Sequence, residues 1–283
     1  MTIRLDHVSF TYQIGTPYEA EALQDVSLSI EQGEFLGLIG HTGSGKSTLI
    51  QHCNGLLFPI SGHVTVDEMP VVPKSKDLKE IRRRVGLVFQ YPEQQLFEET
   101  AALDIGFGPK ALGLSQEEID SRVRWAMDMV ELDYAAFKDA SPFGMSGGEK
   151  RRVAIAGVLA MEPRYLILDE PCAGLDPRGR EEILNQLKRL NEKGIAIILV
   201  SHSMDDIARL AKRLIVIHEG RIVYDDPTRQ VFGKAMELAE MGLDVPEVMK
   251  LMALLHEQGL PVHQDVLTIE EGQDELLRVL KHA

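Results

Sequence analysis

One segment constrains the fold of this chain more than any other: Gly40-His41-Thr42-Gly43-Ser44-Gly45-Lys46-Ser47. It matches the pattern G-x-x-x-x-G-K-[ST] and lies between an apolar run, Phe35 to Ile39, and a predicted helix that begins at Lys46. The glycines let the backbone curl until successive N–H groups point inward, and the helix N-terminus adds about half a unit of positive charge. Such a loop, here Gly40 to Thr48, cradles phosphate groups, with the Lys46 ammonium on the β- and γ-phosphates and the Ser47 hydroxyl on Mg²⁺. The segment therefore predicts a nucleoside triphosphate site, and the alternative is a glycine-rich turn without a ligand.

Three further apolar runs are short, unalternating and partly β-branched: Val85 to Phe89, Tyr165 to Leu168 and Ile195 to Val200. Such runs are typical of strands that are covered on both faces, which usually means a parallel sheet with helices on each side. Helical patterns such as Arg180 to Asn191 lie between the runs. The order of elements predicts an α/β fold.

Polar side chains follow these runs at the point where each predicted strand ends: Gln90, then Asp169 and Glu170, then His202. Because the carboxyl ends of parallel strands share one edge, we expect these residues to meet at the phosphate loop. Asp169 is expected near Mg²⁺, and Glu170 is placed to polarise an attacking water. His202 is interpreted as a sensor of the γ-phosphate, although a lone histidine there is more often structural. Gln90 either binds the water or Mg²⁺, or is an ordinary polar residue that starts a loop.

A second polar motif is Ser146-Gly147-Gly148-Glu149. Read locally, it is an S-x-x-E capping box that opens a helix, and this reading needs no ligand. Two glycines in a first turn are poor for a helix but favour close approach to an anion. Both interpretations can hold together.

The composition excludes several classes of protein. The formal net charge of -14 argues against a nucleic-acid partner, and the basic run at 82–84 is interpreted as a solvated helix face. Cys53 and Cys172 are too few for a secreted disulfide scaffold and are expected to be small buried hydrophobes. No signal peptide is visible, and the longest apolar runs are far shorter than a membrane span.

The two ends of the chain differ in pattern from its middle. The first 30 residues alternate apolar and polar residues, which predicts antiparallel strands beside the main sheet. From about residue 226 the pattern is helical, and Thr268 to Glu271 forms a T-x-x-E capping box. Two apolar stripes occur there at helical spacing: Val248, Leu251, Met252 and Leu255, then Leu276, Leu277 and Leu280. They either pack only on each other or on the rest of the chain, or form a contact with a second subunit.

These motifs occur in one order along the chain: Gly40 to Ser47, Gln90, Ser146 to Glu149, Leu166 to Glu170, Ala173 to Asp176 and His202. Together they resemble the nucleotide-binding subunit of an ABC transporter, over residues 1–225. The resemblance implies a P-loop NTPase fold with a RecA-like core, an antiparallel β subdomain and a helical subdomain at about 91–160. It also implies an ATPase in which the phosphate loop of one subunit and the signature segment, Ser146 to Glu149, of its partner enclose ATP. Asp176 corresponds to the D-loop, and Tyr12 is expected to stack on adenine, with Tyr18 as its rival.

Two longer stretches, Phe89 to Phe97 and Arg151 to Ala160, resemble the ATPases of energy-coupling factor (ECF) importers of vitamins and metal ions. This likeness implies a subunit on the cytoplasmic face of the cell membrane, with Mg²⁺ as cofactor and a C-terminal helical dimerisation appendage at 226–283. It implies three partners: a second ATPase, a transmembrane coupling subunit and a substrate-binding membrane subunit. A paralogue is favoured over a second copy of the same chain, because Ala173 to Asp176 resembles one of two paralogues.

One residue departs from the family pattern. The signature usually ends in Gln, whereas this chain has Glu149, whose charge weakens anion binding unless the side chain turns back to cap its own helix. Two rival functions remain: a non-transport ABC ATPase and a small-molecule P-loop kinase. The first usually carries coiled-coil inserts or tandem cassettes, and the second has no use for the signature segment.

Overall fold

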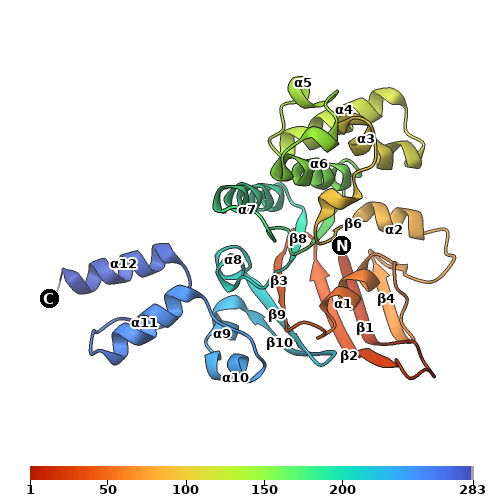
Figure 1. Ribbon diagram of the computed structural model, residues 1–283. Coiled ribbons are helices and arrows are strands. Elements are labelled where there is room, and N and C mark those ends of the chain that lie inside the picture. Colours follow the sequence, from red (N-terminus) through yellow and green to blue (C-terminus); the bar gives the residue numbers. More distant parts are fainter. Residues whose placement is uncertain (282–283) are drawn as a thin grey trace.

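The computed structural model describes residues 1–281 and shows an α/β molecule built on two sheets (Figure 1). The main sheet has the strand order β10-β9-β3-β8-β7-β6, in which adjacent strands are parallel except for the antiparallel edge pair β10 and β9. Its strands are β3 (Phe35–Ile39), β6 (Val85–Val88), β7 (Tyr165–Asp169), β8 (Ala196–Val200), β9 (Arg213–His218) and β10 (Arg221–Pro227). The predicted parallel sheet is confirmed, because all the apolar runs form strands whose ends lie within one residue of the expected positions.

The N-terminal strands form a separate antiparallel sheet, as the alternating pattern predicts. Its order is β2-β1-β4-β5, with β1 (Thr2–Tyr12), β2 (Ala20–Glu31), β4 (Ser61–Val66) and β5 (Met69–Pro70). Ile3 pairs with Ile30 and Leu5 with Leu28, and all of these side chains are buried. The apolar face of this sheet therefore points into the molecule.

The two faces of the main sheet contribute to different cores. In β7, Tyr165 and Ile167 pack with the antiparallel sheet and with α1 (Lys46–Cys53). Leu166 and Leu168, which point to the opposite face, pack with the helices on the other side. Full burial on both faces explains the unalternating apolar runs.

Helices cover the main sheet and form the upper part of the molecule in Figure 1. The helical part comprises α3 (Ala101–Leu112), α4 (Gln116–Met129), α5 (Tyr134–Phe137) and α6 (Gly147–Leu159), with the short helices η1 (Pro92–Gln95) and η2 (Pro142–Gly144). The remaining helices before residue 245 are α2 (Leu78–Arg84), α7 (Pro177–Glu192), α8 (Met204–Leu210), α9 (Thr228–Phe232) and α10 (Ala235–Glu240). No helix within residues 1–281 has the length and apolar character needed to cross a membrane.

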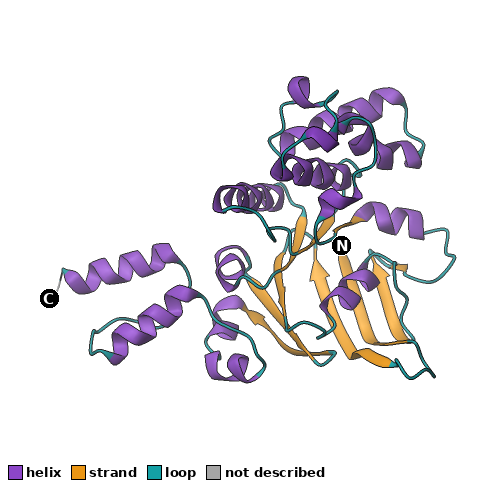
Figure 2. Cartoon of the chain, viewed as in Figure 1, coloured by secondary structure: helices purple, strands orange, loops and turns teal. Residues whose placement is uncertain are grey.

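The C-terminal arm, residues 246–281, extends away from both sheets as a pair of helices, α11 (Glu247–Glu257) and α12 (Ile269–Leu280) (Figure 2). It has a small core of its own around Val248, Met252 and Val279, on which Leu255 and Leu276 pack. Thr268 caps α12 as predicted, but Glu271 accepts a hydrogen bond from the N–H of Leu267 rather than from that of Thr268.

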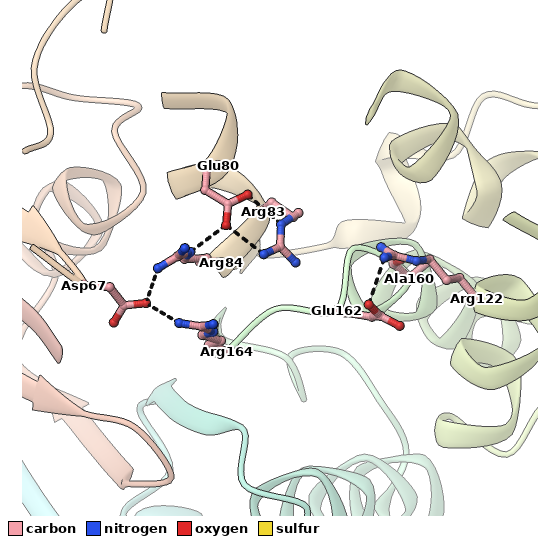
Figure 3. Close-up of polar contacts among 8 residues, drawn as sticks. All are labelled: Asp67, Glu80, Arg83, Arg84, Arg122, Ala160, Glu162 and Arg164. Atoms are coloured by element: carbon pink, nitrogen blue, oxygen red, sulfur yellow. Dashed lines mark hydrogen bonds and ion pairs between the residues drawn. The ribbon is translucent and has the colours of Figure 1, made fainter. Parts of the chain in front are cut away.

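A charged cluster ties the antiparallel sheet to the main sheet (Figure 3). The Asp67 carboxylate, between β4 and β5, accepts hydrogen bonds from Arg84 at 2.8 Å and from Arg164 at 2.9 Å. Hydrogen bonds from Arg83, and then from Arg84, lower the pKa of Glu80 to about 2. The interpretation of 82–84 as a solvated face is therefore wrong for Arg83 and Arg84, whose side chains are paired and only 25% and 21% exposed.

Candidate functional site

The phosphate loop leaves the buried strand β3 and enters α1 through two glycines that no other residue could replace without strain. A Cβ on Gly40 would lie 2.3 Å from the carbonyl oxygen of Ile217, and one on Gly45 would lie 2.5 Å from that of Ala22. Gly45 also has a φ of 110°, a left-handed value that favours glycine. It is the N-cap of α1 and supplies no side-chain cap, so the first N–H groups of α1 remain available to an anion.

Lys46 lies inside this loop. Its Nζ donates hydrogen bonds to the carbonyl oxygens of Gly40 at 2.5 Å and of His41 at 2.9 Å. Burial lowers the pKa of the Lys46 ammonium, while the carboxylates of Glu170 and Asp169 act in the opposite direction. The loop therefore holds a cation at its centre, next to two acidic residues from another strand.

The next residue of the loop contacts the end of β7. The Ser47 hydroxyl donates to Asp169 Oδ2 at 3.2 Å. Burial raises the pKa of the Asp169 carboxyl, and the hydrogen bond from Ser47 and the charge of Lys46 oppose this rise. A hydroxyl and a carboxylate side by side provide the hard oxygen donors that Mg²⁺ prefers.

Glu170 and His202 form the other half of the acidic edge. Their side chains approach to 3.5 Å between Glu170 Oε1 and His202 Nε2, and Glu170 Oε1 has no hydrogen-bond partner within residues 1–281. Burial, with the neighbouring charge of Asp169, raises the pKa of Glu170 to about 7. Burial and the Lys46 charge lower the pKa of His202. A partly buried carboxylate with one buried, unpaired oxygen and a pKa near neutrality has the properties of a general base.

Gln90 and the two candidate tyrosines are placed differently. Gln90 follows β6, the neighbour of β7, so its segment reaches the same edge, but its side chain is exposed. The Tyr12 hydroxyl lies 3.1 Å from Thr48 Oγ1, which brings the Tyr12 ring beside the first turn of α1. Tyr18 is 78% exposed in the turn between β1 and β2. The contact with Thr48 favours Tyr12 for the adenine.

The signature segment lies at the N-terminus of α6 and forms the predicted capping box. Ser146 donates from its N–H and from its hydroxyl to Glu149 Oε2, at 2.8 and 2.7 Å, and these hydrogen bonds lower the pKa of Glu149. Glu149 therefore turns back onto its own helix. Nothing lies within 4 Å of a Cβ built on Gly147 or Gly148.

An open groove of about 670 Å³ runs from this segment to the start of α7. Its lining includes Ser146, Gly147, Gly148 and Asp176 but no residue of the phosphate loop. Asp176 caps α7 by accepting a hydrogen bond from the N–H of Gly179 at 2.7 Å. The structure thus brings Lys46, Ser47, Asp169, Glu170 and His202 together and leaves the signature segment on a separate, exposed surface.

Sequence reasoning missed one buried charge near the site. Arg151 is 2% exposed and hydrogen-bonds to Glu93 and to the loop that follows Glu170. The available signal was its spacing, because Arg151 shares one face of α6 with the buried Ile155 and Leu159, at i+4 and i+8. Cys53 is buried as expected, whereas Cys172 is only partly buried.

Comparison with known proteins agrees with this geometry. The family described as "ABC transporter" matches residues 23–173. The Energy-coupling factor transporter ATP-binding protein EcfA2 of Clostridium tetani is 53% identical over 283 residues, which cover 100% of this chain and 98% of that protein. The protein of the same name from Streptococcus pyogenes is 45% identical and is covered in full.

Solved structures show the same fold. The structure of cbiO1 from Clostridium perfringens, described as part of the ABC transporter complex cbiONQ, has a TM-score of 0.75 at 36% identity and covers 89% of this chain and 98% of its own. The ATP-binding cassette MJ0796, a dimer in a post-hydrolysis state with ADP and Pi, has a TM-score of 0.70 at 32% identity and covers 80% of this chain and 98% of its own. The chain therefore belongs to the ABC transporter family, among the ATP-binding proteins of energy-coupling factor transporters.

Proposed function

We propose that this chain binds ATP with Mg²⁺ and hydrolyses it to drive the import of vitamins or metal ions through partner membrane subunits, on the cytoplasmic face of the membrane. One observation carries the proposal: the contact of Ser47 with Asp169 and that of Glu170 with His202 lie beside a phosphate loop whose helix N-terminus is uncapped. These groups supply a phosphate cradle, candidate Mg²⁺ ligands and a candidate base for an attacking water, which are recurring parts of phosphoryl-transfer sites.

Each residue has a role that its environment supports. Ser47 and Asp169 would bind Mg²⁺. Gln90 would be a further ligand of the ion or would bind the attacking water. No group of three or more His, Cys, Asp or Glu side chains suited to a metal gathers in the part of the chain that the structure describes, so the triphosphate must supply further ligands. The bound ion would offset charge on the phosphates. Glu170 accepts a proton from the water, and His202 orients the γ-phosphate and that water.

The test is Glu170→Gln, which keeps the size of the side chain and removes the base. Turnover should fall by about 10²- to 10⁴-fold, the usual contribution of a general base, while ATP binding is retained. Turnover is measured in the assembled complex and ATP binding by equilibrium titration. A variant within about threefold of wild-type turnover would show that Glu170 is not the base.

A complete ATP site requires a second ATPase subunit in this proposal. The signature groove lacks a phosphate loop, and the phosphate loop lacks a signature segment, so two subunits placed head to tail complete two sites. Asp176, at the edge of the groove, would contact the partner's nucleotide site. The second subunit is proposed to be a paralogue, as the resemblance of Ala173 to Asp176 indicates.

A second groove, of about 360 Å³, supports the proposal of a membrane partner. It lies between β6, η1, α3 and α6, and begins next to Gln90 at Phe89. Phe97 and Phe107 stand edge to face there with ring centroids 5.0 Å apart, and they are 57% and 50% exposed. Exposed paired aromatics beside a groove are typical of a docking site. We assign it to a cytoplasmic helix of the transmembrane coupling subunit, which in turn would carry the substrate-binding membrane subunit.

The C-terminal arm is proposed as a permanent contact between the two ATPases. Leu251, Leu277 and Leu280 are 46%, 45% and 69% exposed, although the other members of both stripes pack in the core of the arm. The start of this appendage near residue 226 stays a prediction, and Leu238 and Leu243 pack into the main core.

The variant Leu277→Glu with Leu280→Glu tests this contact in the full chain. Without nucleotide, the two ATPase subunits should separate, as measured by light scattering. Met236→Glu is the matched control, because Met236 is 85% exposed outside the arm. Unchanged association of the arm variant would leave only a structural role for the stripes.

A further inference from the structure

Arg151 is a buried cation whose four side-chain hydrogen bonds go to η1 and to the loop after Glu170. Its Nε and Nη2 donate to Glu93 Oε2 and Oε1 at 3.0 and 2.8 Å. Its Nη1 donates to the carbonyl oxygens of Pro171 and Ala173 at 2.9 and 2.7 Å. The Arg151 side chain is 3% exposed, so water cannot reach its N–H groups. Loss of any of these partners would leave a buried donor without an acceptor.

These partners belong to segments that sequence alone does not connect. Glu93 lies in η1, three residues after Gln90, beside the groove assigned to the membrane partner. Pro171 and Ala173 lie one and three residues after Glu170, and the N–H of Ala173 donates to the Glu170 carbonyl oxygen at 3.1 Å. Arg151 itself lies on α6, which begins at the signature segment. The Arg151 guanidinium therefore links α6, which carries the signature segment, to the segment after Gln90 and to the loop after Glu170.

The four acceptors around residue 151 favour an arginine at this position. Only a planar fork with five N–H donors can hold both carboxylate oxygens and two carbonyl oxygens at once. Burial would raise the pKa of Glu93, but the hydrogen bonds from Arg151 hold it below its usual range. The backbone at Glu170 has a φ of 51°, a left-handed value that is less favourable for a residue with a side chain than for glycine. The carbonyl contacts of Arg151 lie one and three residues beyond this strained position.

We propose that Arg151 is a positioning residue for ATP hydrolysis: it ties the segment after Gln90 to the loop after Glu170, so that displacement of one moves the other. The inference rests on the roles proposed above for Gln90 and Glu170. None of the four side-chain hydrogen bonds of Arg151 goes to Lys46 or to Tyr12. Loss of its fork therefore changes the placement of the base and leaves the binding of ATP intact.

Arg151→Lys tests this in the complex of the full chain with its partners. The ammonium keeps the buried charge but cannot make all four hydrogen bonds, so kcat should fall about tenfold at an unchanged KM for ATP. Arg122→Lys is the matched control. Arg122 is 19% exposed, pairs with Glu162 at 2.9 Å and bonds the Ala160 carbonyl oxygen, but contacts no loop of the site (Figure 3). Because Arg122 is more exposed and makes fewer hydrogen bonds than Arg151, its variant should lose less thermal stability, and it should keep wild-type kcat.

Glu93→Gln and the double variant make the test independent of folding defects. Glu93→Gln keeps one acceptor and should also lower kcat at constant KM. If Arg151 and Glu93 act only through their contact with each other, kcat of the double variant should be no lower than that of Arg151→Lys alone. If they act independently, the two decreases in kcat would multiply. Equal kcat in Arg151→Lys and Arg122→Lys, or multiplied effects, overturns this inference alone. A wild-type complex without ATP turnover contradicts the proposed function and this inference with it.

Discussion

Two helices of this chain begin with glycines beside a proposed phosphate site, and they differ in how their first turns are satisfied. The N-cap of helix α1 is Gly45, which offers no side-chain cap, so the first N–H groups of the helix stay free and Lys46 lies among them. The N-cap of helix α6 is Ser146, whose hydroxyl and N–H both donate to the Glu149 carboxylate. One helix N-terminus is open and positive, whereas the other is closed by a negative charge of its own.

The difference shows what each end can do alone. A free N-terminus with a buried cation binds a triphosphate without help, because its dipole and its donors act together. A self-capped N-terminus is stable without a ligand, and its own carboxylate opposes the approach of an anion. We infer that α1 binds the nucleotide and that α6 contributes only after a partner subunit has bound it.

Removing the Lys46 ammonium or the Ser146 hydroxyl should have different effects on ATP binding to the isolated chain, and this is the largest difference we expect. Lys46→Ala removes a buried charge from the phosphates and should weaken ATP binding to the isolated chain by at least about 30-fold. Ser146→Ala should leave that binding unchanged and lower turnover of the assembled complex about tenfold, since it removes one hydroxyl from a shared site. ATP binding is measured by titration of the isolated chain, and turnover by phosphate release.

In a mixed complex, the Ser146 defect should appear at the site that contains the partner's phosphate loop. Nucleotide crosslinking that placed Ser146 beside Lys46 of the same chain would contradict the comparison, because α1 and α6 would then serve one site.

The fold was predictable from sequence to a large extent, for a physical reason. Strands buried on both faces have nothing but apolar residues, so 165–168 and 195–200 could be read directly, and polar residues at their ends had to share one edge. The contacts of Ser47 with Asp169 and of Glu170 with His202 follow from that rule.

The charged residues were harder to predict, because a sequence shows a charge but not its partner. Arg84 and Arg164 meet at Asp67 across two sheets, and Arg151 meets Glu93 58 positions away. Helical spacing marks Arg151 as buried, but no local pattern identifies the carbonyl groups that receive its donors. The exposure of Leu251, Leu277 and Leu280 in the arm was likewise not predictable, since spacing cannot tell which leucines a small core has room for.

The pH dependence of turnover compares the two glutamates directly. The pKa of Glu170 is raised to about 7 by burial and by Asp169, whereas hydrogen bonds from Ser146 lower that of Glu149. A base works when ionised, so kcat should be constant above about pH 7 and fall about tenfold per pH unit below it. Glu149 stays ionised between pH 5.5 and 8.5, so its titration does not change kcat in this range. The measurement is kcat at saturating ATP between pH 5.5 and 8.5.

His202 provides the control for this profile. Its pKa is lowered by burial, so it is mostly neutral above pH 6.5 and the limb at pH 7 should not be its own. His202→Gln should therefore lower kcat and keep the shape of the profile. A profile that became flat in His202→Gln would assign the titration to the histidine.

The smallest expected effect concerns the charge that closes α6. Glu149→Gln keeps an acceptor for the Ser146 N–H but removes the negative charge and loosens the hold on the Ser146 hydroxyl. Two like charges a few ångströms apart in water repel by about 1 kcal/mol or less, so ATP-dependent association of the ATPase subunits should tighten about threefold. Association is measured in a Glu170→Gln background to prevent turnover.

The chain carries its own control for that variant, a capping box with the same geometry at the start of α4. Ser115 donates from its N–H and hydroxyl to Glu118 Oε2 at 2.9 and 2.7 Å, beyond the signature groove. Glu118→Gln should cost the same small loss of helix stability, because a carboxylate leaves a helix N-terminus in both cases. It should not change association. Weaker association in Glu149→Gln, or an equal gain in Glu118→Gln, would mean that the carboxylate of the signature segment does not oppose the partner's nucleotide.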